Sequence, residues 1–321
     1  MTPRTPPAAP AGSLIAAAVL LAAASAASYA RASAEVRGLD LFPATVTDAF
    51  GREVTVPLPP KRIVTVFSSN TELVASLGLS GLIVGIDAMT FYPPEIVDVR
   101  KIGGRLGISL EEVVDARPDL VLLTPARQAA HNLLGPLGRL GIPAAVFTAR
   151  DFPEIEGNLM KTAVLCGVPG RGEELVRSLE GRLAAVRRAR GGLPRPRTVI
   201  LYARLSSGLF LAAREGDYPA SLIGLAGGIP ALDEEVSGPR VPQISPEALM
   251  GLDPDIIILT RRADEGTELF DYLQKPAFAR LKARRTGQIH VVPSAEFLIP
   301  AARVVDGVER LARIFTEWGG R

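Results

Sequence analysis

The chain has 321 residues, with 36 Lys and Arg against 34 Asp and Glu, two His and one Cys. This near balance of charge excludes bulk positive charge as a basis for nucleic-acid binding, and a single cysteine excludes an internal disulfide. Cys166 ends the apolar run Ala163-Val164-Leu165-Cys166 and is predicted to be a small buried hydrophobic residue. No stretch after residue 34 is long and apolar enough to predict a membrane span.

Residues 1–34 are predicted to be a secretory signal peptide. Arg4 precedes the apolar run 14–27, and small residues around Ala30 and Ala34 offer cleavage sites. The run is shorter than the roughly 20 residues that a membrane span needs, and an uncleaved anchor is the alternative. Removing this segment takes away two arginines and no acid, which leaves 287 residues with 34 basic and 34 acidic side chains. That length suffices for two domains.

The position of the single cysteine bears on where the mature protein resides. Cys166 is far from the predicted cleavage region, so no cysteine is placed to carry a lipid anchor. We therefore expect a free, monomeric protein in the periplasm.

Short apolar runs alternate with helical patterns over residues 45–150, which we assign to an N-terminal lobe. The predicted strands there are 62–67, 82–86, 120–124 and 144–147, with helices near 70–78, 109–116 and 129–140. Apolar runs without alternation are typical of strands covered on both faces. A mainly parallel sheet follows from this order of strands and helices.

The rest of the chain is predicted to hold a helical connection and a second lobe. Residues 151–192 are helical, and within them 171–190 has apolar positions at helical spacing on a charged background. One helix of about 20 residues would be about 30 Å long, enough to cross between lobes. Residues 193–321 form the C-terminal lobe, with predicted strands at 198–202, 209–212, 255–260 and 289–292. The expected fold is α/β, with two Rossmann-like lobes joined by a single long rigid helix.

An internal repeat supports two equivalent lobes. Residues 108–124, ISLEEVVDARPDLVLLT, align without gaps to 244–260, ISPEALMGLDPDIIILT, with seven identities in seventeen positions. Ser109 and Ser245 are placed to be helix N-caps, and each is followed two residues later by a glutamate, Glu111 or Glu247. A Pro-Asp pair then ends each helix and begins a strand.

Two interpretations are open for the repeated glutamates Glu111 and Glu247. A carboxylate in the first turn of a helix is stabilised by the helix dipole by roughly 0.3–1 kcal/mol, which is a sufficient structural reason for its presence. Their equivalent positions in two lobes also suit a partner that has two equivalent subunits.

The chain resembles a known family in four segments. These are PPKRIVTVFSSNTELVASLGL at 59–79, GIDAMTFYPPE at 85–95, KIGGRLGISLEEVVDARPDLVLL at 101–123 and RVPQISPEALMGLDPDIIIL at 240–259. Together they resemble the periplasmic substrate-binding proteins of ABC importers for iron-siderophores, haem and cobalamin, the class III proteins with a helical backbone. The resemblance implies that the ligand lies between the lobes, and that Glu111 and Glu247 dock on the arginines of an inner-membrane permease dimer.

Candidate ligand-binding residues in the first lobe follow two predicted strands. Open α/β sheets bind ligands at the carboxyl ends of their strands. Ser68, Ser69 and Asn70 follow the first strand and could offer hydroxyls and amides to an anionic group, or act as a plain N-cap. Phe91 and Tyr92 precede Pro93-Pro94, where they could contact a ligand or pack against the prolines.

Arginines and aromatic residues complete the predicted site. Arg105 lies among glycines, where the cobalamin binders that the chain resembles carry an aromatic side chain, and a guanidinium there suits an anionic chelate. Tyr202, Arg204, Arg240 and Phe297 are the candidates from the second lobe, with ordinary surface or packing roles as the alternative.

These residues lead us to expect a ferric siderophore as the ligand and no enzymatic activity. Haem and cobalamin are the alternatives, and a tyrosine such as Tyr92 or Tyr218 could be an axial ligand to haem iron. With two histidines and one cysteine, the sequence has no Cys/His pattern for a bare metal site and predicts no resident cofactor. The rival class is a two-lobed α/β enzyme, although no G-x-S-x-G, H-E-x-x-H or P-loop motif is present.

Overall fold

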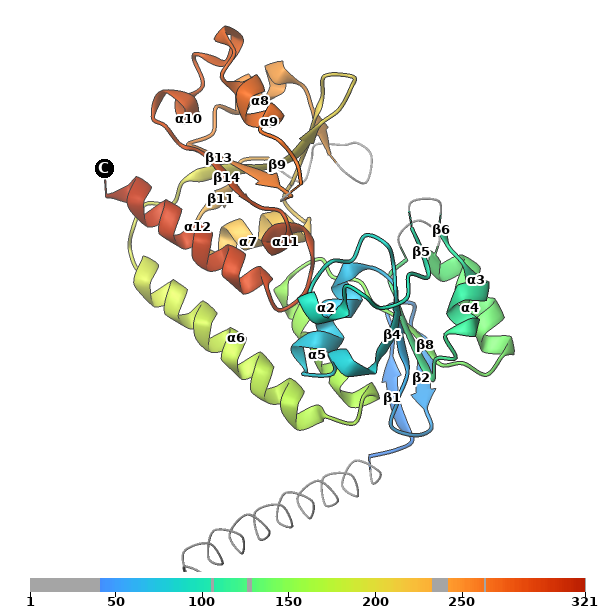
Figure 1. Ribbon diagram of the computed structural model, residues 1–321. Helices are drawn as coiled ribbons and strands as arrows, with labels where there is room; N and C mark the ends of the chain where they lie inside the picture. Colours follow the sequence, from blue (N-terminus) through green and yellow to red (C-terminus); the bar gives the residue numbers. More distant parts are fainter. Residues whose placement is uncertain (1–40, 105–106, 126–128, 233–241, 263, 321) are drawn as a thin grey trace, which may run out of the picture.

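The computed structural model describes residues 41–104, 107–125, 129–232, 242–262 and 264–320. It has two α/β lobes joined along one side by a long helix (Figure 1), as predicted. The predicted signal peptide lies outside the described residues. In the part of the chain that is described, none of the helices has the length and apolar character to cross a membrane.

The N-terminal lobe contains a four-stranded parallel sheet in the order β4-β3-β7-β8. Its strands are β3 (Ile63–Thr65), β4 (Ile83–Ile86), β7 (Leu120–Leu123) and β8 (Ala144–Val146), with the hairpins β1 (Ala44–Thr47) to β2 (Glu53–Val56) and β5 (Gly103–Gly104) to β6 (Gly107–Ile108). Its helices are α2 (Ser68–Ser76), α3 (Leu110–Asp115) and α4 (Ala129–Arg139). All four residues of β7 are buried, as expected for a strand covered on both faces.

The C-terminal lobe has a six-stranded mixed sheet. Its main order is β12-β10-β9-β13-β14, and β11 also pairs with β9. The strands are β9 (Arg197–Arg204), β10 (Phe210–Ala212), β11 (Ile229–Pro230), β12 (Gln243–Ile244), β13 (Ile256–Arg261) and β14 (Ile289–Pro293). The helices are α7 (Tyr218–Leu225), α8 (Pro246–Leu252), α9 (Glu268–Leu273), α10 (Lys282–Arg285), α11 (Ala295–Leu298) and α12 (Val304–Gly319).

The helical connection contains two helices, of which the second crosses between the lobes. The first, α5 (Phe152–Leu165), packs on α2 and β1, and the second, α6 (Pro169–Arg190), runs beside α12 (Figure 1). The 22 residues of α6 span about 33 Å. Arg182 of α6 bonds Asp306 at 2.6 Å and Glu309 at 2.8 Å, both on α12. A single cluster of buried apolar residues continues from the first sheet through α5 and α6 to α12.

The repeat seen in the sequence recurs in the geometry of the two lobes. The hydroxyl oxygens of Ser109 and Ser245 accept the backbone N–H groups three residues later, which confirms both predicted N-caps. Asp119 accepts the backbone N–H of Lys61 at 2.8 Å, and Asp255 accepts that of Arg197 at the same distance. Each aspartate thus ties the start of its own strand to the neighbouring parallel strand.

The close approach of α6 to α5 depends on a glycine. A Cβ at Gly172 would lie 2.6 Å from Ala163 Cβ and 3.0 Å from Met160 Sδ, whereas one at Gly181, in the same helix, would meet nothing within 4 Å. Gly172→Ala should lower the free energy of unfolding by about 1–3 kcal/mol, because the two helices must separate. Gly181→Ala should raise it by about 0.5–1 kcal/mol through helix propensity. Urea unfolding followed by circular dichroism measures both, and equal effects would contradict this packing.

Cys166 is buried, as predicted. Burial, with a smaller contribution from Asp119, raises the pKa of its thiol to about 12. The thiol should therefore not react with Ellman's reagent at pH 8 while the protein is folded, and should react fully in concentrated urea. Fast labelling of the native protein would show that the α5 terminus opens to solvent.

Candidate ligand-binding cleft

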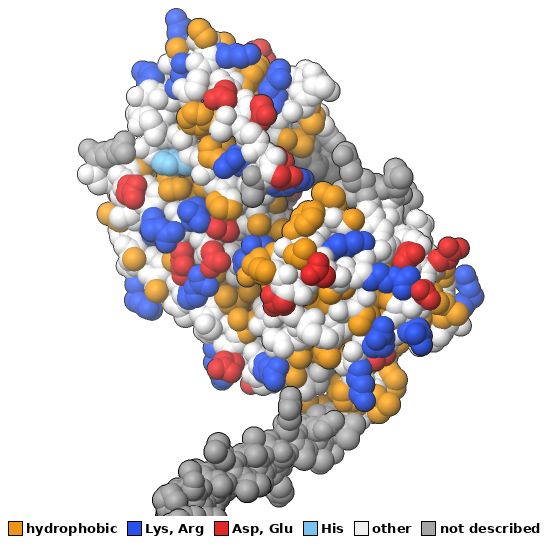
Figure 2. Space-filling model, viewed as in Figure 1, with side chains coloured by type: hydrophobic (Ala, Val, Ile, Leu, Met, Phe, Trp, Pro, Cys, Tyr) orange, Lys and Arg blue, Asp and Glu red, His pale blue; other side chains and the backbone are white. Residues whose placement is uncertain are grey.

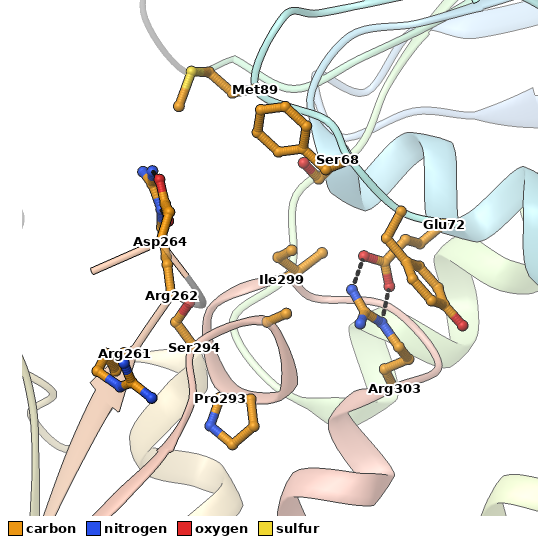
Figure 3. A pocket seen from close by; sticks show the side chains of 13 residues that line it. Ser68, Glu72, Met89, Arg261, Arg262, Asp264, Pro293, Ser294, Ile299 and Arg303 are labelled. Carbon is orange, nitrogen blue, oxygen red and sulfur yellow. Dashed lines mark hydrogen bonds and ion pairs between the residues drawn. The ribbon is translucent and has the colours of Figure 1, made fainter. Parts of the chain in front are cut away.

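A pocket of about 490 Å³ lies between the two lobes (Figure 3). It is formed where β3 and β4 of the first lobe and β13 and β14 of the second lobe end, the position at which open α/β sheets bind ligands. We call it the interlobe pocket. Its lining residues are Ser68, Glu72, Met89, Phe91, Tyr92, Arg261, Arg262, Asp264, Pro293, Ser294, Ala295, Ile299 and Arg303. Figure 2 shows side chains of both charge signs intermixed on both lobes around it.

A buried aspartate organises the first-lobe side of the pocket. The carboxylate of Asp87 accepts the backbone N–H of Phe67 at 3.0 Å, the backbone N–H of Met89 at 2.8 Å and the hydroxyl of Thr90 at 2.6 Å. The Ser68 hydroxyl in turn lies 3.0 Å from that of Thr90. These bonds fix the segment after β4 against the start of α2.

This segment presents apolar side chains to the pocket. Phe91 is 62% exposed and Tyr92 is 42% exposed, and both line the pocket together with Met89. Exposed aromatic side chains in a concave site are typical of ligand contacts.

An ion pair joins the two lobes at one end of the pocket (Figure 3). Arg303 donates to both carboxylate oxygens of Glu72, at 2.8 Å from Nε and 2.5 Å from Nη2. Its guanidinium also lies over the ring of Tyr92, 3.7 Å from the centroid. Glu72 is only 3% exposed, and burial raises its pKa although Arg303 opposes that effect.

The second-lobe side carries two further arginines with different partners. Arg262 pairs with Asp264 and more distantly with Glu265. Arg261 donates to the backbone carbonyl of Glu265 at 2.8 Å, and no ion pair to it is found among the described residues. Arg261 is therefore the arginine of this pocket best placed to receive an anionic group.

Tyr202 and Arg204 line an adjoining hollow of about 270 Å³ that shares Arg261 with the interlobe pocket. The guanidinium of Arg204 lies 4.1 Å from the ring centroid of Tyr272. A register shift in the pairing of β9 with β10 leaves Tyr202 without a partner residue on β10. Burial raises the pKa of the Tyr202 phenol well above the usual range. The two predicted residues thus lie near the pocket, separate from its lining.

Three other predicted residues lie away from the pocket. Ser69 and Asn70 border a different hollow, and Asn70 is fully buried, donating to the Val66 carbonyl at 2.7 Å and the Thr124 hydroxyl at 3.0 Å. Phe297 is fully buried in the core. Asn70 and Phe297 thus have roles in internal hydrogen bonding and packing, whereas Ser69 is half-buried beside that other hollow.

Two predicted arginines, Arg105 and Arg240, lie outside the described residues. Tyr218, considered as an axial ligand to haem iron, is 8% exposed and does not line the interlobe pocket. Within the described part of the chain, no group of three or more His, Cys, Asp and Glu could hold a metal ion.

Glu111 and Glu247 are exposed in the first turns of α3 and α8. Each helix runs into a strand of the parallel array, so its N-terminal end lies at the carboxyl edge of its sheet, as the pocket does. The hydroxyl of Ser245 lowers the pKa of Glu247, which favours its charged form. Figure 1 shows α3 and α8 in different lobes, both away from α6.

The sequence predictions did not include several residues that form the pocket. Asp87 and Arg261 could have been found, because each stands at the end of a predicted strand. The ion pair of Glu72 with Arg303 has no local signal, since the two residues are 231 positions apart.

The chain is similar to several curated proteins. It is 24% identical over 302 residues to the uncharacterized ABC transporter substrate-binding lipoprotein YvrC of Bacillus subtilis, covering 93% of this chain and 94% of that protein. It is 23% identical to the vitamin B12-binding protein of Vibrio cholerae, covering 79% of this chain and 89% of that protein.

Two solved structures have a similar fold. One is the periplasmic heme-binding protein RhuT of Roseiflexus, with a TM-score of 0.69 at 26% identity, covering 81% of this chain and 99% of that one. The other is from an ABC-type Fe³⁺-hydroxamate transport system of Saccharomonospora viridis, with a TM-score of 0.69 at 25% identity, covering 85% and 99%. The family model for periplasmic binding proteins matches residues 63–296. Because this match covers most of the chain and includes residues of both lobes, the chain belongs to the periplasmic binding protein family.

Proposed function

We propose that this protein binds a metal chelate in the interlobe pocket and delivers it to the permease of an ABC importer, without catalysing a reaction. The observation that carries the proposal is a pocket lined from both lobes that combines exposed aromatic side chains with an arginine, Arg261, that has a backbone carbonyl as its partner. A chelate needs both kinds of contact, because its organic shell is apolar and its donor groups are anionic.

A ferric siderophore is the first candidate ligand. Arg261 and Arg204 both border the hollow that adjoins the interlobe pocket. No ion pair to either is found among the described residues, so their positive charge could meet negative charge that would remain on a ferric chelate. Haem and cobalamin are the second candidate, favoured by Phe91 and Tyr92 and by the similarity to a heme-binding and a vitamin B12-binding protein.

Arg261→Gln should weaken the binding of an anionic chelate about tenfold, because a hydrogen bond to a charged group is worth about 1.5–3 kcal/mol. Fluorescence titration with a ferric siderophore, haemin and cyanocobalamin would measure this. Arg188→Gln, on the exposed face of α6, makes the same change in net charge and should leave affinity unchanged. An equal loss of affinity in both variants would show that only the net charge of the protein matters. Failure of all three ligands to bind would contradict the proposed ligand class.

The docking of the permease is assigned to Glu111 and Glu247. Exposed ion pairs contribute about 0–1 kcal/mol, but pairs that lose water at an interface can contribute more. Replacing both glutamates by alanine should leave chelate affinity within about twofold, since neither residue lines the pocket. It should sharply reduce stimulation of the permease ATPase in reconstituted vesicles.

A matched control removes two exposed glutamates, Glu173 and Glu180 of α6, and should leave ATPase stimulation intact. Charge reversal of Glu111 and Glu247 to arginine should be worse than alanine, because it places like charges together. Full stimulation of the permease ATPase by the alanine double variant would show that Glu111 and Glu247 only stabilise the first turns of their helices.

A further inference from the structure

Two flat groups stack at the wall of the interlobe pocket. The guanidinium carbon of Arg303 lies 3.7 Å from the centroid of the Tyr92 ring, and both residues line the pocket. The Tyr92 ring and the Arg303 guanidinium each contact the other through one face. The second face of each plane lies on the outside of the stack. Guanidinium and aromatic planes both accept a further flat group by stacking.

Glu72 holds the guanidinium of this stack in place. It binds Nε and Nη2 of Arg303 in the two-pronged arrangement that fixes the plane of a guanidinium. Arg303 comes from the second lobe, whereas Glu72 and Tyr92 come from the first, so the stack can form only when the lobes are in register. With its charge matched by Glu72, Arg303 is a poor receptor for an anion but keeps its flat face.

Burial of the Glu72–Arg303 ion pair carries a desolvation cost. Glu72 has 3% of its surface exposed, and a buried ion pair often stabilises a fold no better than apolar residues of the same size. The same three residues also border a second hollow, of about 310 Å³ beside α6, so open space lies on both sides of them. Residues that only fill a core are not bordered by two hollows. The position of Glu72, Tyr92 and Arg303 therefore favours a role in the ligand site.

We propose that Glu72 and Arg303 are positioning residues that hold the Tyr92–Arg303 stack as a platform for a flat conjugated part of the chelate. This inference rests on the proposed function and narrows its ligand class. A tetrapyrrole or an aryl catecholate has such a flat part, whereas an aliphatic hydroxamate does not. The polar end of the same ligand would lie toward Arg261, at the other end of the pocket (Figure 3).

The test is a double-substitution cycle on affinity, with haemin, cyanocobalamin, ferric enterobactin and ferrichrome as probes. Glu72→Gln and Tyr92→Leu should each weaken the flat-faced probe that binds by about tenfold, the size of a typical coupling between contacting side chains. The two together should weaken it little more than either alone, because both act through one platform. Arg303→Lys, which keeps the ion pair but loses the flat guanidinium, should also weaken it.

Glu296→Gln is the matched control. Glu296 binds Arg310 through two hydrogen bonds of 2.7 Å, both residues lie in the second lobe, and neither lines the interlobe pocket. Glu296→Gln should leave the affinity for the probe unchanged. It should lower the thermal unfolding temperature about as much as Glu72→Gln does, because each variant removes one partner of an ion pair. If Glu72→Gln folds poorly, Arg303→Lys carries the cycle with Tyr92→Leu.

Additive losses from Glu72→Gln and Tyr92→Leu, or an equal loss from Glu296→Gln, would overturn the platform and leave the proposed function standing. Binding of ferrichrome alone would overturn the flat ligand and likewise preserve the function. Failure of all four probes to bind would overturn both.

Discussion

The two lobes of this protein meet at a carboxylate that has almost no contact with water. Glu72 receives two hydrogen bonds from Arg303 across the lobe boundary, and Arg303 carries the ring of Tyr92 on its face. The relative position of the lobes determines whether these three side chains meet. The shape of the interlobe pocket depends on this relative position, because its lining residues come from two lobes that are far apart in the chain.

The helical connection maintains the register over a longer distance. Helix α6 is attached to the first lobe through α5, where Gly172 allows a close approach, and to the second lobe through Arg182 and α12. The apolar core passes continuously through these helices. Since a dense core resists gradual deformation, we expect the pocket to be largely formed before the ligand arrives.

The sequence predicted the fold better than the site, for physical reasons. Strands and helices leave local periodic patterns, and the repeat predicted the serine caps of α3 and α8 correctly. Met89, Phe91 and Tyr92 lie on an irregular segment, whose direction is set by contacts such as those of Asp87. Phe91, Tyr92 and Ser68 line the interlobe pocket, whereas Phe297 on α11 and Asn70 on α2 are buried, because a side chain on a helix that follows a strand can face either the pocket or the core.

We propose that a single ligand contacts both lobes at once. Amide hydrogen exchange, measured with and without the chelate that binds, tests it most directly. We expect added protection in the segment after β4, residues 87–92, and also in the segment from β14 to α12, residues 293–303. Protection confined to one of these segments, or found instead on α6 and α12, would contradict a ligand site between the lobes.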